Sequence, residues 1–215
     1  MNKKSLWQIL SLSAILGVIF YIIHVILGGI LWKGYNHMTQ TISELTGENA
    51  PDAAFLSKLT FAYGILLVIF SISLLMIFLQ KKVHKLAILG SILLIVMEIT
   101  SLIGYSLFPL NTELDMSSFQ NMMHMVVTAV VVICTIGFGF FIGIGLLKTK
   151  GLKRIGIFVL VCAIIITVAG SLTPITMVNN IPIAGLFERI NIFTLHICTI
   201  GLSISSFHGL KISNS

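Results

Sequence analysis

The sequence predicts an all-α protein, an integral membrane bundle of six transmembrane helices with both termini cytoplasmic. Hydrophobic residues make up 57% of the chain and charged residues only 9%, whereas a soluble domain carries about 25% charged residues. The mean hydropathy is +1.07. The apolar residues form six runs, each long enough for the ~20 residues that cross a bilayer. We therefore expect residues 1–215 to form a single transmembrane domain.

The first three helices are predicted at residues 6–32, 55–80 and 86–108. The first run follows two lysines, as a signal peptide would. It is too long for the apolar region of a signal peptide, and no small-residue cleavage site closes it, so we expect a retained helix. The second run follows Pro51, which suits the start of a helix, and the third ends before Pro109.

The remaining helices are predicted at residues 118–147, 152–173 and 183–207, and the fifth is expected to end at Pro174. The fourth carries Gly139 and Gly143 as a G-x-x-x-G pair, which is typical of close helix packing. This pattern does not separate packing inside the bundle from dimerisation, so an oligomer remains an unsupported possibility. The cysteines Cys134, Cys162 and Cys198 lie inside apolar runs, and we expect neither a disulfide nor a cysteine metal site.

Charged residues divide between the two ends of the predicted helices. Ten of the thirteen basic residues lie at the N-terminus, in the turns at residues 81–85 and 148–154, and in the C-terminal tail. Six of the seven acidic residues lie at the opposite ends. The positive-inside rule then places both termini in the cytoplasm of a multi-pass cell-membrane protein. We interpret the basic clusters as topology signals, so the expected partners are membrane lipids and no nucleic acid.

The longest polar interval is the stretch from Tyr35 to Pro51, YNHMTQTISELTGENAP. Thr41 and Glu44 form a capping-box pattern, and Gly47 suits the end of the short helix that they would start. Other polar residues are expected at the same membrane face, near the starts of the fourth and sixth helices. Together they predict an outer polar pocket of Glu44, Asn111, His124, Glu188 and Arg189.

Arg189 needs a partner from another segment, because its neighbour Glu188 cannot share its helix face. Glu44 and Glu113 are the expected partners. Such a pair would fasten the loop to the bundle. The alternative is that the guanidinium binds the phosphate or carboxylate of a head group.

Three ionisable residues, His24, Glu98 and His196, are expected at similar depth inside the membrane, where such groups need a specific reason. Neutral side chains bonded to neighbouring hydroxyls or backbone are one interpretation, and an ion or proton relay is another. Two histidines and a carboxylate could also bind iron or zinc. No short metal-ligand spacing supports that third interpretation, so we assign no metal and no cofactor.

The loop YNHMTQTISELTGENAP, the pair Phe108-Pro109 followed by His124, and GLFER at residues 185–189 resemble the bacterial multi-pass membrane family known as domain of unknown function 998 (DUF998). The chain departs from the family pattern in two places. Leu110-Asn111 stands where Cys-Asp is expected, and Glu188 where Gln is frequent. The resemblance implies a six-helix fold and an outward-facing polar cluster, and no established reaction.

Three functional classes follow. A protein that binds a lipid or an anionic head group would use the outer pocket. A small ion- or proton-coupled transporter would use the tier of His24, Glu98 and His196. An outer-leaflet lipid-modifying enzyme would use Glu44, His124 and Arg189 as base, acid and anion clamp. The sequence contains no recognised nucleophile motif, so whether the chain is an enzyme stays open.

Overall fold

The computed structural model describes residues 4–48, 50–111 and 118–210, and all regular structure in these ranges is helical. Six helical segments are long and apolar enough to cross a membrane, which confirms the predicted all-α membrane bundle. The elements are α1 (Leu6–Leu10), α2 (Ser13–Leu31), the 3-10 helix η1 (Ser43–Thr46), α3 (Ala53–Gln80), α4 (Lys85–Leu107), α5 (Phe119–Leu147), α6 (Lys153–Val178) and α7 (Ala184–Phe207).

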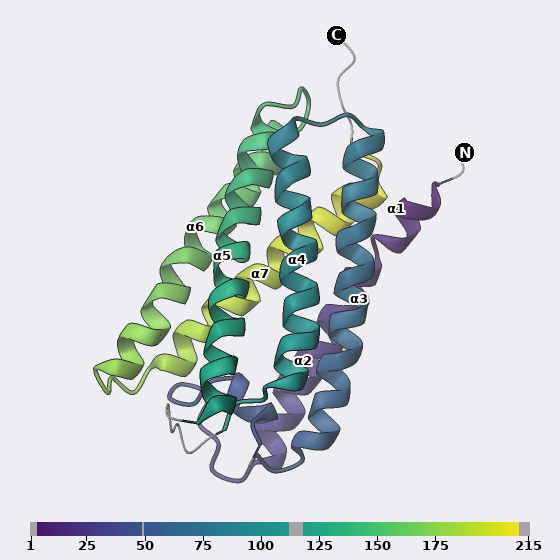
Figure 1. Cartoon of the computed structure of the whole chain (residues 1–215). Coiled ribbons are helices and arrows are strands. Elements are labelled where there is room, and N and C mark those ends of the chain that lie inside the picture. Colours follow the sequence, from purple (N-terminus) through teal and green to yellow (C-terminus); the bar gives the residue numbers. More distant parts are fainter. Residues whose placement is uncertain (1–3, 49, 112–117, 211–215) are drawn as a thin grey trace.

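The helices run up and down in chain order, each packing against the next. The last helix, α7, crosses obliquely behind α4 and α5 and returns to α2 and α3 (Figure 1). The bundle therefore closes between its first and last spanning segments. We call the contact between α2 and α7 the seam. Its contacts are fewer than those between helices that are consecutive in the chain.

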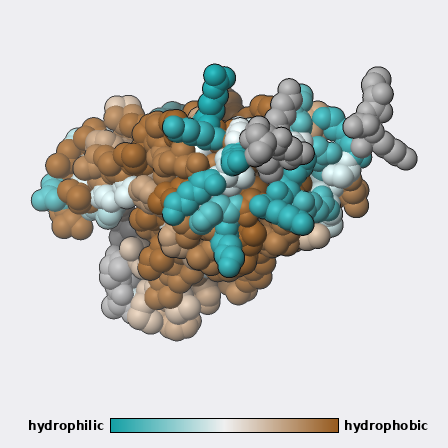
Figure 2. Space-filling view, turned by 90° about the horizontal axis from the view of Figure 1, so that it is seen from above, coloured by the Kyte–Doolittle hydropathy of each residue, from teal (hydrophilic) through white to brown (hydrophobic). Residues whose placement is uncertain are grey.

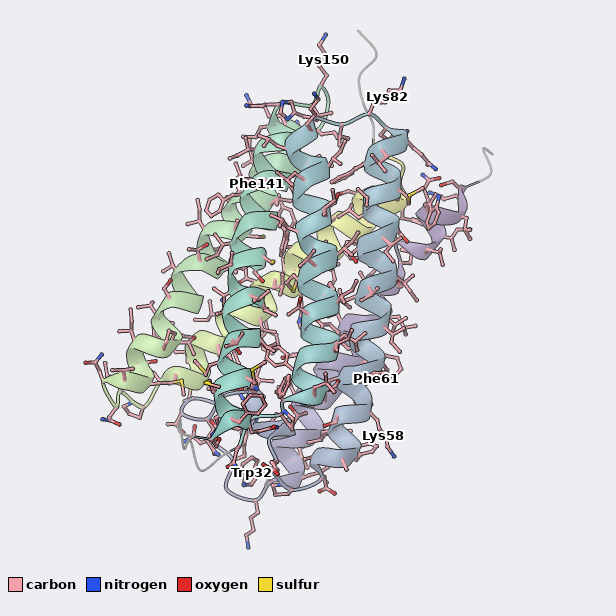
Figure 3. All side chains as sticks on the ribbon, in the orientation of Figure 1. Trp32, Lys58, Phe61, Lys82, Phe141 and Lys150 are labelled. Carbon is pink, nitrogen blue, oxygen red and sulfur yellow. The ribbon has the colours of Figure 1, made fainter. Side chains whose placement is uncertain are left out.

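The two ends of the bundle differ in composition. One end holds both termini and the two basic turns, and hydrophilic side chains gather there above an apolar body (Figure 2). Lys82 and Lys150 lie at this basic end, and Trp32 and Lys58 lie at the other (Figure 3). The opposite end holds residues 32–48 and 50–52, residues 108–111 and the α6–α7 turn, and we call it the loop end.

The first predicted helix is divided in two. The chain breaks between α1 and α2 at Ser11 and Leu12, where the Ser11 hydroxyl donates to the carbonyl of Gln8 at 2.8 Å. Such a local side-chain bond offers the backbone an alternative to the helical ladder. The Ser203 hydroxyl of α7 donates to the Ser11 carbonyl at 2.7 Å. The break therefore places a free carbonyl where α7 can bind it.

The expected end of the fifth helix at Pro174 is wrong, because α6 continues to Val178 and Pro174 lies inside it. A proline removes one helical hydrogen bond, here the one that the carbonyl of Gly170 would accept. Membrane helices tolerate such a loss. The sequence prediction used the rule that a helix ends before a proline, which holds for soluble proteins and less well inside a membrane.

The glycine pair of α5 packs inside the bundle. A Cβ at Gly139 would meet the side chain of Ala163 at 2.8 Å, and one at Gly143 would meet Leu160 at 2.6 Å. Both neighbours belong to α6, so the two glycines allow α5 and α6 to approach closely. This surface is already used within the chain.

Candidate functional site

Arg189 connects α7 to the long loop at the loop end. It lies in the second turn of α7 and is only 9% exposed. Its Nη1 donates to the carbonyl of Gln40 at 2.8 Å and to that of Gly185 at 2.9 Å. Its Nη2 donates to the Tyr35 hydroxyl at 2.8 Å and contacts His37 Nδ1 at 3.0 Å. One guanidinium therefore holds three loop residues, and we call this group the arginine clamp.

The two nearby carboxylates bind the loop and not Arg189. Glu188 accepts hydrogen bonds from the backbone N–H groups of Ile42 and Ser43. Glu44 accepts from the Thr41 N–H at 2.8 Å and from the Thr41 hydroxyl at 2.9 Å. The expected Glu44–Arg189 ion pair is thus wrong, since each side chain has other partners. Glu113, the other expected partner, lies outside the described residues.

The capping pattern at Thr41 and Glu44 forms in part. The Glu44 carboxylate satisfies the Thr41 N–H as a capping box requires, and the short helix that follows is the 3-10 helix η1, closed by Gly47. Gln40 adds a third bond, donating from Nε2 to Glu44 at 3.1 Å. These bonds order the same stretch of backbone whose carbonyl Arg189 holds.

Gly185 allows the loop to reach α7. A Cβ at this position would collide with the carbonyl oxygen of Gln40 and lie 2.8 Å from Nη1 of Arg189. The Leu186 N–H, one residue further on, donates to the carbonyl of Met38 at 3.1 Å. The GLFER motif therefore combines a glycine that admits the loop with an acid and a base that bind it.

Tyr35 and His37 complete the clamp from the loop side. The Tyr35 hydroxyl donates to the Thr41 carbonyl at 2.6 Å, and its burial raises the pKa of the phenol to about 12, although the hydrogen bond and charge of Arg189 act in the opposite direction. Partial burial, followed by the charge of Arg189, lowers the pKa of His37. Arginine can only donate, so His37 Nδ1 accepts and the ring proton lies on Nε2.

This geometry predicts that acidification loosens the clamp. The pKa of His37 is lower in the folded protein than its ordinary value of 6.5, so the unfolded chain takes up the proton first. Stability is therefore full above about pH 6.5 and falls as the pH drops below that value. We expect the thermal unfolding midpoint of the natural protein in detergent to be lower at pH 5 than at pH 7.5.

The control for this prediction is His37→Gln, whose side-chain oxygen can still accept a bond from Arg189 but cannot take up a proton. The drop in thermal midpoint should be smaller in this variant. Equal drops in both proteins would show that His37 does not sense pH through Arg189.

A second group of bonds joins the same loop to the start of α5. The Glu48 N–H donates to the Leu110 carbonyl at 2.9 Å, and its carboxylate accepts from Asn111 Nδ2 at 3.2 Å. The Asn111 N–H donates to Asn121 Oδ1 at 2.9 Å. His124 Nδ1 lies 2.8 Å from the carbonyl of Phe108, so this nitrogen carries the proton.

The predicted outer residues therefore fall into two groups. Glu44, Glu188 and Arg189 lie with the first part of the loop, whereas Asn111 and His124 lie with Glu48, where the loop meets α5. The prediction missed Tyr35, His37, Gln40, Glu48 and Asn121. Tyr35 and His37 precede residues 42–45 (ISEL) within the same polar interval. Their place in that interval was the one sequence feature that could have indicated them. Gln40 acts through its carbonyl, which no side-chain pattern reveals.

The deeper predicted residues are all buried, with His24 1%, Glu98 3% and His196 3% exposed. Both histidine rings pack against Tyr21, with centroids 5.4 Å away for His24 and 4.6 Å away for His196. His196 Nε2 lies 3.2 Å from the Tyr63 hydroxyl. Glu98 is close enough for its charge to act on that same phenol. In the described ranges, no three His, Cys, Asp or Glu side chains come together as metal ligands.

Two surface hollows lie away from these groups. A polar hollow of about 230 Å³ at the basic end is lined by Ser5, Gln8, Ile77, Gln80 and Lys81. An apolar groove of about 260 Å³ lies between α6 and α7, lined by residues such as Val168, Leu172 and Phe187. Neither is lined by a residue that the sequence singled out.

Comparison with known proteins finds one family. A model described as "Protein of unknown function (DUF998)" matches residues 15–205. The match covers most of the chain, including the long loop, the start of α5 and the GLFER segment. No curated protein and no solved structure matches the chain.

Proposed function

The chain belongs to the DUF998 family of multi-pass membrane proteins of unknown function, and on that premise we propose that its loop end binds the anionic head group of a membrane lipid. The proposed ligand is a phosphate-bearing lipid of the leaflet that the loop end faces. Arg189 would be the principal contact, with Tyr35 and His37 beside it. The carboxylates that order the loop would keep these groups in position.

The observation that carries this proposal is the surroundings of Arg189. Its guanidinium is always charged and 9% exposed, yet its hydrogen bonds go to two carbonyls, a phenol and a neutral imidazole. Its Nε is buried without an acceptor. The nearby carboxylate of Glu188 is bonded to the loop backbone and not to Arg189. A bound anion would therefore stabilise the buried cation, and a phosphate oxygen could accept the unused N–H.

The loop also supports a site for a head group more than a catalytic centre. His124 is bound to the Phe108 carbonyl, and Glu44 is bound to Thr41 and Gln40, so neither of the residues expected as acid and base of an enzyme bonds to Arg189. The cation and the loop backbone remain as the recognition elements. Binding of an anion requires no further group.

Native mass spectrometry of the purified, delipidated protein tests the proposal. The protein would be offered anionic and zwitterionic phospholipids with identical acyl chains. The natural protein should retain the anionic lipid preferentially, and Arg189→Gln should reduce this preference about tenfold or more, because one charged hydrogen-bonding group is lost. Arg189→Lys, which keeps the charge but not the fork, should fall between them.

Lys58→Gln is the matched control, because Lys58 lies at the same end of the bundle and outside the clamp (Figure 3). It removes the same charge and should leave the preference unchanged. Equal losses for Lys58→Gln and Arg189→Gln would point to general surface charge and would overturn the site. Equal retention of the anionic and the zwitterionic lipid by the natural protein would also overturn the site.

The proposal includes an orientation in which both termini and the basic turns face the cytoplasm, in accordance with the positive-inside rule. A single cysteine at Glu48, in a background without the natural cysteines, should react with an impermeant thiol reagent in intact cells. A cysteine at Lys150 should react only after permeabilisation. Both positions are exposed, so the opposite labelling would reverse the orientation.

A further inference from the structure

The seam between α2 and α7 holds a buried polar cluster that the head-group proposal does not use. Tyr21 and His24 come from α2, Tyr63 from α3, and His196 from α7, with Glu98 of α4 beside Tyr63. The Tyr21 and Tyr63 rings lie 4.8 Å apart, and the Tyr63 and His196 rings 5.5 Å apart. Four helices thus direct ionisable side chains to one place inside the bundle.

Buried side-chain atoms without a hydrogen-bond partner occur on the two helices that form the seam. The described residues hold five such nitrogen or oxygen atoms, and all belong to α2 or α7. They are both ring nitrogens of His24, Nδ1 of His196, Nε of Arg189 and Oγ of Ser206. His24 and His196 are 1% and 3% exposed, so neither ring reaches bulk solvent.

Water is the partner that fits these nitrogens. A buried polar atom without a partner is costly, and inside a membrane neither lipid nor bulk water can supply one. A neutral imidazole needs both an acceptor and a donor. His196 has Tyr63 at one nitrogen and nothing at the other, and His24 has nothing at either. Buried water typically satisfies such groups.

The seam is closed at both ends. Towards the basic end the Ser203 hydroxyl bonds to the Ser11 carbonyl at 2.7 Å, and at the loop end the arginine clamp covers it. Arg189, His196 and Ser203 follow one another at intervals of seven residues along α7, which keeps them on one helix face. This face meets α2 and the segments that flank it.

We propose that the α2–α7 seam encloses water and that His24 and His196 form a proton-binding site within it. The ligands are water and one proton, which an unpartnered imidazole nitrogen accepts to give an imidazolium. Such enclosed ionisable groups are the usual elements of proton relays in membrane proteins.

The ionisable groups around this site come from α2, α3, α4 and α7. Tyr21 and Tyr63 face the histidines directly, Glu98 acts on Tyr63, and Tyr105 of α4 acts on Tyr21. The charges of Glu188 and Arg189 also reach Tyr21 from the loop end.

Nitrogen-15 NMR of the histidine-labelled protein in bilayers tests this proposal. His24→Gln and His196→Gln identify the two signals, and the exposed His208 serves as the reference for free exchange. We expect the ring N–H groups of both histidines to exchange in deuterated water. We also expect at least one of the two rings to change from neutral to imidazolium as the pH is lowered.

Two results would overturn the proposal. Ring protons that stay unexchanged while His208 exchanges would show a dry seam. Signals that remain neutral at every pH at which the protein stays folded would show that no proton binds.

This inference is independent of the head-group proposal. The NMR measurement needs no lipid ligand, and the lipid preference needs no titration of His24 or His196. Each can therefore fail without the other.

Discussion

Arg189→Met should lower the free energy of unfolding by about 3 kcal/mol or more, the largest effect that we expect from a single side chain at the loop end. Methionine has a similar length but cannot donate. The change removes the donor from the carbonyl of Gln40, the hydroxyl of Tyr35 and the ring nitrogen of His37. Each hydrogen bond to a charged group contributes about 1.5–3 kcal/mol to stability. A buried acceptor that loses its donor costs more than the average hydrogen bond contributes.

Unfolding in mixed detergent micelles measures this effect, and a cysteine at Thr41 reports on the loop. Thr41 is 4% exposed, so its cysteine should be protected in the natural background and reactive in Arg189→Met. The chain has one other arginine, Arg154, which lies exposed at the basic end. Arg154→Met should change stability by under ~0.5 kcal/mol. Similar losses of unfolding free energy in Arg154→Met and Arg189→Met would show that Arg189 contributes no more to stability than an exposed arginine.

Gly185→Ala should destabilise the protein by about 1–3 kcal/mol, although alanine normally favours a helix over glycine. The new methyl group would occupy the position of the Gln40 carbonyl oxygen and crowd Nη1 of Arg189. These are backbone and tightly bonded atoms, so the loop must move away from α7. The same unfolding titration and thiol reactivity at Thr41 measure the result.

The combination of the two changes provides the sharper test. Arg189→Met and Gly185→Ala break the same contact between α7 and the Gln40 carbonyl. Their effects on stability should therefore sum to clearly more than the loss in the double variant. Strict additivity would mean that the glycine and the arginine act on different parts of the molecule.

The helices were predictable because the hydrocarbon thickness fixes their length and lipid forbids unpaired backbone. Every predicted span is present, and most boundaries agree within one or two residues. The exceptions have local causes. Ser11 bonds to its own helix and to α7, which divides the first span. Pro174 lies inside α6, because membrane helices tolerate the single hydrogen bond that a proline removes.

The site was predictable in location and not in its bonds. Polar residues at one membrane face marked the three segments, and the structure does connect the loop with both α7 and the start of α5. The pairing of Arg189 was wrong because the sequence prediction sought an opposite charge. The actual acceptors include the carbonyls of Gln40 and Gly185, and such acceptors depend on how the loop folds.

The closure of the seam has a consequence for how the protein is made. Ser11 and its partner Ser203 are 192 positions apart in the chain, and synthesis at ~5–20 residues per second separates them by roughly 10–40 s. During that interval α2 lies in the membrane with His24 and the Ser11 carbonyl facing lipid, water or a helper protein. The nascent bundle stays open along one side until α7 is inserted, so the final helix completes assembly and the loop can be clamped only then.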